Sequence, residues 1–118
     1  MFRLRTVALI SLASVFSIPA FAHSKPKIME PAANSTVEAP TELSVIFSEA
    51  LDPKFSSLAL TDEKGTVLSK AKTIADPANH MHLSLPLPKL APGTYYVHWV
   101  SAAVDGHRMD GDYSFKVK

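Results

Sequence analysis

The stretch Thr94-Tyr-Tyr-Val-His-Trp-Val-Ser101 decides the fold class. It is rich in aromatic and β-branched residues, which fit a pleated, half-buried surface. Successive side chains of a strand point to opposite faces. One face therefore carries Tyr95, Val97 and Trp99, and the other carries Tyr96, His98 and Val100. We expect Trp99 to point into the core and His98 to point outward.

Further short apolar segments lie on both sides of this strand. The candidate strands are Leu43–Phe47, Ser57–Thr61, Thr66–Leu68, His82–Leu85 and Tyr113–Lys118. In the last segment we expect Tyr113, Phe115 and Val117 to face the core. Prolines punctuate the rest of the chain and mark edges and loops. No segment has a convincing helical period, and Pro77 would limit any helical turn within Ala71–Ala78. These patterns predict an all-β fold, either an antiparallel sandwich or a barrel.

The first 22 residues do not fit this pattern. Arg3 and Arg5 precede the apolar run Val7–Ile18, and Pro19 then leads into Ala20-Phe21-Ala22. This order is typical of a secretory signal peptide, and the run is shorter than the roughly 20 residues that span a bilayer. We expect cleavage after Ala22, export to the periplasm, and a single soluble domain over residues 23–118.

Composition excludes several functions. The formal net charge is only +1 and no run of Lys or Arg is present, whereas sequence-independent nucleic-acid binding needs a basic excess. The chain has no cysteine, so it has neither disulfides nor thiolate ligands. A metal site would have to use His, Met, Asp, Glu or the terminal amine.

Cleavage after Ala22 would place His23 at the start of the mature chain. A terminal histidine offers an α-amine and an imidazole Nδ1, which can chelate one metal ion. The amine has an unperturbed pKa near 7.7–8.0, and metal binding promotes its deprotonation. Without a second group nearby, His23 would be an ordinary frayed end.

The second candidate is Asp105-Gly106-His107. Residues two apart in an extended segment point the same way, so the carboxylate and the imidazole could converge. Asp-Gly is also a common turn pair. Together with His23, the motif provides an amine, two imidazoles and a carboxylate. This set suits tetragonal Cu(II), while zinc could use it tetrahedrally; the stability order favours copper. The interpretation assumes that the fold brings His23 and His107 together.

Both ends of the expected mature chain resemble one family. The start, HSKPKIMEPAANSTVEAPTELSVIFSEALD (23–52), has the terminal histidine, the P-A-x-x-S element and the F-S-E strand end of CopC-type periplasmic copper-resistance proteins. The end, GTYYVHWVSAAVDGHRMDGDYSFKVK (93–118), is similar to their G-T-Y-x-V-x-W, D-x-H and G-x-x-x-F closing segment. The resemblance implies a small antiparallel, Ig-like β-sandwich with Greek-key connections and about seven strands.

The resemblance also implies a function and a site. It makes the chain a non-catalytic Cu(II) carrier or buffer in copper resistance, with a CopD-type membrane copper transporter as partner. The implied ligands are His23, through its amine and ring, Asp105 and His107. Glu49, the glutamate of F-S-E, would be an outer-sphere partner of a ligand ring.

One family feature is missing. Some members bind Cu(I) in a methionine-rich loop, but here Met29, Met81 and Met109 are scattered, so no Cu(I) site of that type is predicted. His80-Met81-His82 is the nearest substitute. It could form a weak second site for Cu(I) or Ag(I), or an edge strand with its polar residues outward, which we favour.

Two other functions remain open. A terminal histidine with a second histidine also forms the copper brace of oxidative polysaccharide-cleaving enzymes, although Asp105 would occupy an additional coordination position here. No nucleophile elbow or Ser/His/Asp signature is present. Alternatively, the domain binds a protein and no metal, because a sandwich fold by itself carries no function.

Overall fold

The structure, a computed structural model, describes residues 23–118; the signal peptide expected over residues 1–22 lies outside the described residues. Residues 23–118 form eight strands and no helix. The strands are β1 (Pro26–Glu30), β2 (Thr36–Val37), β3 (Glu42–Phe47), β4 (Ser57–Thr61), β5 (Ile74–Asp76), β6 (Asn79–Pro86), β7 (Gly93–Ala102) and β8 (Arg108–Val117).

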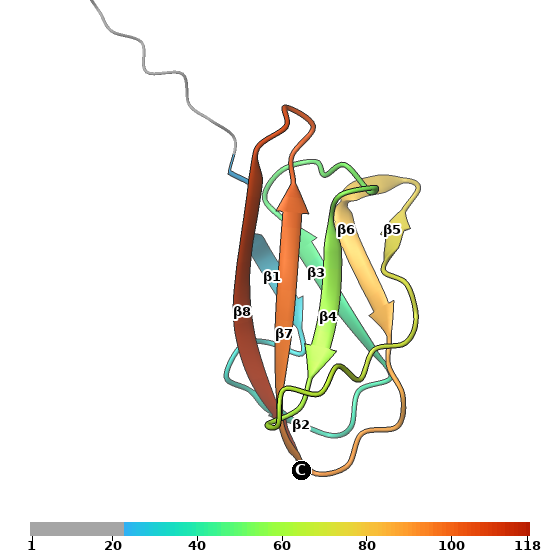
Figure 1. The fold of residues 1–118 in the computed structure, drawn as a ribbon, viewed down its shortest axis with the longest axis vertical. Helices are drawn as coiled ribbons and strands as arrows, with labels where there is room; N and C mark the ends of the chain where they lie inside the picture. The colour runs from blue at the N-terminus through green and yellow to red at the C-terminus, as the bar shows by residue number, and fades with distance from the viewer. Residues whose placement is uncertain (1–22) are drawn as a thin grey trace, which may run out of the picture.

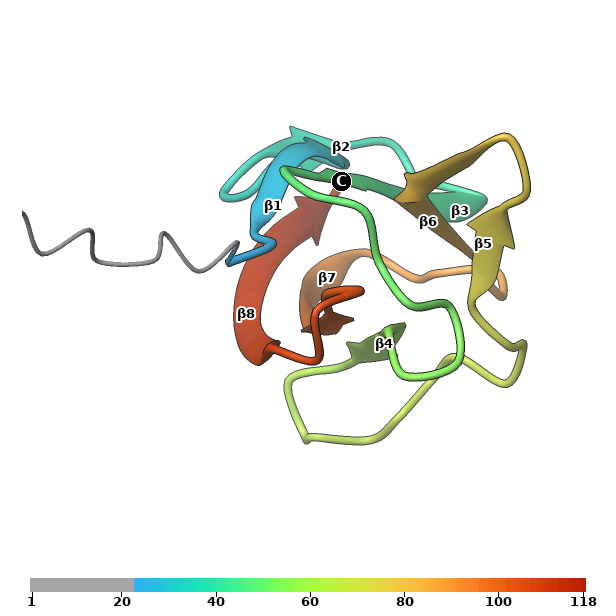
Figure 2. The ribbon, with the colours of Figure 1, turned by 90° about the horizontal axis from the view of Figure 1, so that it is seen from above.

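The strands form two four-stranded sheets that pack face to face (Figures 1 and 2). One sheet has the order β1-β3-β6-β5 and the other the order β2-β8-β7-β4. The chain crosses between the sheets after β1, β2, β3, β4 and β6. The expected all-β sandwich is confirmed. One pair departs from the antiparallel rule, because the two-residue β2 runs parallel to the end of β8.

The longest pairing is the β7–β8 hairpin. Its register runs without a shift from Gly93↔Val117 to Ala102↔Arg108, so the loop at its far end is held by two full strands. The expected alternation holds along β7, where Tyr95, Val97 and Trp99 are buried. Val100, expected on the outer face, is also buried. Near this end of β7, Asp52 from the segment after β3 donates its N–H to the Ala102 carbonyl.

One expectation for the middle of the chain is wrong. Thr66–Leu68 is not a strand and forms only an isolated bridge between Val67 and Thr61. Beyond that bridge, a side-chain hydrogen bond takes the place of a backbone one at the edge of β4: the N–H of Leu60 donates to the Ser69 hydroxyl. Ala71–Ala78 forms no helical turn, in keeping with the absence of a convincing helical period, but it contains strand β5, which was not predicted.

The core lies between the two sheets and contains the predicted aromatic residues. Phe47 of β3 meets Trp99 edge-on with 5.9 Å between ring centroids, and Tyr95 stacks on Phe115 at 5.9 Å. Such pairs contribute about 0.5–1.5 kcal/mol beyond the area they bury. Phe115 and Val117 are buried and Tyr113 is partly buried against them, as predicted. Among residues 23–118, no helix is long and apolar enough to cross a membrane.

Candidate metal centre

The D-x-H motif forms the loop that joins β7 to β8. The loop closes through two backbone bonds, from the Ala103 N–H to the His107 carbonyl at 2.8 Å and from the Gly106 N–H to the Ala103 carbonyl at 2.9 Å. Gly106 has φ of 93°, a conformation that glycine adopts without steric cost. Asp105-Gly106 therefore lies in a turn, as the sequence pair indicated. The turn keeps the two candidate ligands, Asp105 and His107, close together.

Asp105 and His107 are in direct contact within this loop. The Oδ1 atom of Asp105 accepts a hydrogen bond from the His107 backbone N–H at 3.0 Å and lies 3.1 Å from the ring Nδ1 of His107. The backbone N–H bond lowers the pKa of Asp105 below its usual value, and the His107 side chain acts in the same direction. The carboxylate is therefore ionised at neutral pH and available as a hard oxygen donor.

The start of the described chain lies beside this loop. The imidazole of His23 meets that of His107 with 6.1 Å between ring centroids and 75° between ring planes. In Figures 1 and 2 the blue segment that begins at residue 23 lies next to the end of β8 from which the loop emerges. The fold thus brings together two imidazoles that the sequence separates by most of its length.

Ser24 anchors this segment. Its side chain is only 1% exposed, and its backbone carbonyl accepts a hydrogen bond of 2.6 Å from the hydroxyl of Ser101 in β7. Its own hydroxyl donates to the Glu49 carbonyl at 3.0 Å and accepts from the Glu49 N–H at 3.3 Å. Ser48 adds a bond from its hydroxyl to the His23 carbonyl at 3.3 Å. His23 therefore projects from a fixed backbone.

The donors are neighbours, but they do not yet converge. Within residues 23–118, no group of three or more His, Asp or Glu side chains is clustered tightly enough to hold a metal ion. The missing donor in the predicted set is the α-amine of His23, which exists only when the chain begins at that residue. The donor chemistry fits copper: two imidazoles and an ionised carboxylate within one surface region, with nitrogen and oxygen atoms only.

The backbone of Glu49 has a structural role that the sequence did not indicate. Its backbone carbonyl and its backbone N–H both hydrogen-bond the Ser24 hydroxyl, while its side chain is exposed. The glutamate of F-S-E therefore belongs to the segment that fixes His23, through main-chain atoms. An outer-sphere role for its carboxylate stays a prediction.

The triplet His80-Met81-His82 lies at the start of β6, in the other sheet. His80 and Met81 are exposed. The ring of His82 is engaged: its Nε2 lies 2.8 Å from the Ser44 hydroxyl and its Nδ1 lies 3.6 Å from the Asp76 carboxylate. Binding a soft cation here would have to replace these contacts. The weak second site stays a prediction, and the edge-strand alternative agrees with this geometry.

Sequence reasoning gave no role to His98. It lies directly across from Asp112 in the β7–β8 register, and its Nδ1 is 2.9 Å from that carboxylate. Asp110, two residues along β8, lies 3.9 Å from Nε2. His98 thus forms an exposed cross-strand polar cluster. The partners of Ser24 and Ser101 were also missed, because nothing in a local pattern shows that two serines share a hydrogen bond.

Comparison with known proteins agrees with this architecture. The CopC domain matches residues 27–118. The chain belongs to the CopC family. Copper resistance protein C of Xanthomonas campestris pv. juglandis is 35% identical over the full length of both chains. Copper resistance protein C of Escherichia coli is 37% identical over 84% of each.

Solved structures of CopC proteins have the same fold. CopC from Methylosinus trichosporium OB3b matches with a TM-score of 0.76 and 29% identity over 81% of this chain and 94% of that one. PcoC from Escherichia coli, described as methionine rich, matches with a TM-score of 0.71 and 35% identity over 82% of this chain and 100% of that one. This CopC-family chain does not share the methionine richness, since Met29, Met81 and Met109 are scattered along its described part.

Proposed function

We propose that this CopC-family chain is a periplasmic copper-binding protein that holds Cu(II) through His23, Asp105 and His107. The observation that carries the proposal is the contact between the His23 and His107 rings beside the Asp105 carboxylate. The two relatives described above are named copper resistance protein C. The family resemblance and the donor set both favour copper.

The proposed coordination divides the donors between two parts of the fold. The amine and ring of His23 would form a chelate on the anchored first segment. The loop would supply an imidazole nitrogen of His107 and a carboxylate oxygen of Asp105. This set of three nitrogens and one oxygen suits the tetragonal geometry of Cu(II) and lacks the sulfur donors that Cu(I) prefers.

We propose a binding role, in which the protein buffers Cu(II) or delivers it to a CopD-type membrane transporter. The ligands sit on the surface: the His107 side chain is 39% exposed and that of Asp105 is 41% exposed. An exposed site allows an acceptor protein to approach the ion directly. A copper-brace enzyme would need an open coordination position, and Asp105 would occupy one.

The decisive experiment is Cu(II) titration and electron paramagnetic resonance on protein whose first residue is His23. A matched version carries one extra alanine in front. We expect tight one-to-one binding with a nitrogen-rich tetragonal signal, which the extra alanine alters because it converts the amine into an amide. Identical signals in the two versions would exclude His23 as the anchor.

His107→Ala provides an independent test. Losing a direct ligand should weaken Cu(II) binding by more than the roughly 10–100-fold that is typical of outer-sphere partners. His98→Ala is the matched control, because His98 lies outside the loop and is held by Asp112. Unchanged affinity in His107→Ala would overturn the assignment.

A further inference from the structure

A cavity of about 610 Å³ lies between the segment after β4 and the segment after β6. Its apolar lining includes Val67 and Leu68 on one wall and Pro86, Leu87 and Pro88 on the other. The volume lies within the range of sites that bind small molecules, about 300–1,000 Å³. None of its lining residues belongs to the candidate copper site, so copper binding does not account for it.

Both walls of this groove are fixed to the sheets. Leu68 donates its N–H to the Leu60 carbonyl at 2.8 Å, and the Ser69 hydroxyl accepts from the Leu60 N–H at 3.2 Å. On the other wall, Leu87 donates its N–H to the Thr41 carbonyl at 2.9 Å. The prolines of that wall have a fixed φ. A ligand entering such a preformed groove loses little affinity to ordering the protein.

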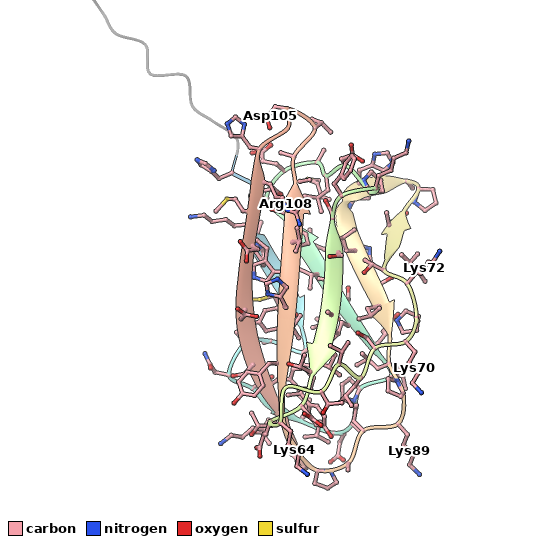
Figure 3. The ribbon with its side chains drawn as sticks, viewed as in Figure 1. Lys64, Lys70, Lys72, Lys89, Asp105 and Arg108 are labelled. Carbon is pink, nitrogen blue, oxygen red and sulfur yellow. The ribbon has the colours of Figure 1, made fainter. Side chains whose placement is uncertain are left out.

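The charged residues of the groove are both cationic. Lys70 and Lys89 line it, and no acidic side chain does. In Figure 3, Lys70 and Lys89 lie toward the lower end of the molecule, with Lys72 above them and Lys64 at the base, whereas Asp105 lies at the opposite end. Among the lysines of residues 23–118, Lys118 has a carboxylate within 4.0 Å, whereas Lys70 and Lys89 have none. Lys70 and Lys89 are therefore available to an anionic ligand.

We propose that this groove binds a free monoanionic amphiphile, such as a medium-chain carboxylate. The hydrocarbon chain would lie along Val67, Leu68 and Leu87, and the carboxylate would meet Lys70 and Lys89. The shape favours a free ligand over a bilayer surface. Leu68 and Leu87 are partly buried and packed against the core. A flat membrane would therefore reach the exposed rim, Val67, Pro86 and Pro88, but not these two leucines.

The test is a titration of ¹⁵N-labelled, copper-free protein with decanoate below its micelle concentration. Decyltrimethylammonium serves as a cationic probe with the same chain. We expect saturable shifts confined to residues 66–71 and 86–89 with decanoate only, and affinity that rises about fourfold for each added methylene group while the groove has room. Shifts spread over the surface, equal binding of the cationic probe, or binding only above the micelle concentration would each overturn the proposal.

Two pairs of variants assign the contacts. Lys70→Gln with Lys89→Gln should weaken decanoate binding about tenfold or more, while Lys27→Gln with Lys116→Gln removes the same charge elsewhere and should leave it unchanged. Val67→Glu should abolish binding, whereas Ile74→Glu, at a similarly exposed position in β5, should not. Equal effects within either pair would contradict the site.

A bilayer that contains anionic lipids is the other source of an anionic headgroup, and vesicles test it. Sedimentation with phosphatidylcholine vesicles, with and without phosphatidylglycerol, should give no binding that depends on Lys70 and Lys89. Lysine-dependent binding to the anionic vesicles without binding of decanoate would identify a membrane-docking surface and would overturn the proposed free ligand.

Discussion

The hydroxyl of Ser101 in β7 donates a 2.6 Å hydrogen bond to the backbone carbonyl of Ser24. Both side chains are only 1% exposed. This buried bond fixes the residue next to His23 to the strand that leads into the Asp105–His107 loop. The two halves of the candidate copper site are thus held together by groups that bind no metal.

Ser101→Ala should therefore weaken Cu(II) binding without removing a ligand. Loss of the bond costs about 1 kcal/mol, and because the bond holds the first segment in place we expect Cu(II) affinity to fall about fivefold. Competition titration against a chelator would measure it. Thr73→Val is the control, because Thr73 also bonds backbone, at Leu58, but away from the loop. Equal Cu(II) affinity in both variants would show that the anchor does not matter.

Loss of the hydroxyl should lower the stability of the fold at Tyr95 but not at Tyr113. The Tyr95 hydroxyl donates to the Ala91 carbonyl, so Tyr95→Phe should destabilise the fold by about 1 kcal/mol. Burial raises the pKa of Tyr113, and its hydroxyl has no hydrogen-bond partner among the described residues. Tyr113→Phe should be neutral or stabilising. Urea unfolding of both variants would measure this, and equal losses would contradict it.

Gly111 should not tolerate a side chain. It lies opposite Trp99 in the register, and a Cβ atom there would approach the indole ring to 2.6 Å. Gly111→Ala should destabilise the fold by about 1–3 kcal/mol, as overpacking does, and should shift the tryptophan fluorescence. In a double-mutant cycle with Trp99→Phe the effect of the alanine should shrink, because the smaller ring makes room. Additive losses would contradict the contact.

The Asp105 carboxyl should titrate below its ordinary value. The His107 N–H bonds the ionised form, so the folded-state pKa is lowered. The carboxylate's contribution to the loop is therefore present above the unfolded-state pKa of about 3.9 and is lost as the pH falls through the folded-state value. Carbon-13 NMR of the carboxyl group, in native protein and in urea, would measure both. A native midpoint at or above the urea value would contradict it.

Much of the fold was predictable from local pattern. Alternation along Thr94–Ser101 placed Trp99 in the core, and the same period placed Phe115. The pattern failed at Thr66–Leu68, where Ser69 and Thr73 bond the edge of β4 with their hydroxyls. Side-chain bonds of this kind have no periodicity. The period of two also does not show that Val100, on the face opposite Trp99, is buried.

The sequence by itself determined which donors are available: the imidazoles, a carboxylate one glycine away from His107, and no thiolate. It also determined the strands that alternate regularly, such as β7 and β8, because the side-chain period of two is a local property. Only the tertiary structure decided that the ring centroids of His23 and His107 lie 6.1 Å apart. That contact depends on sheet order, on the β7–β8 register and on the bond between Ser24 and Ser101, which are long-range pairings that local periodicity does not specify.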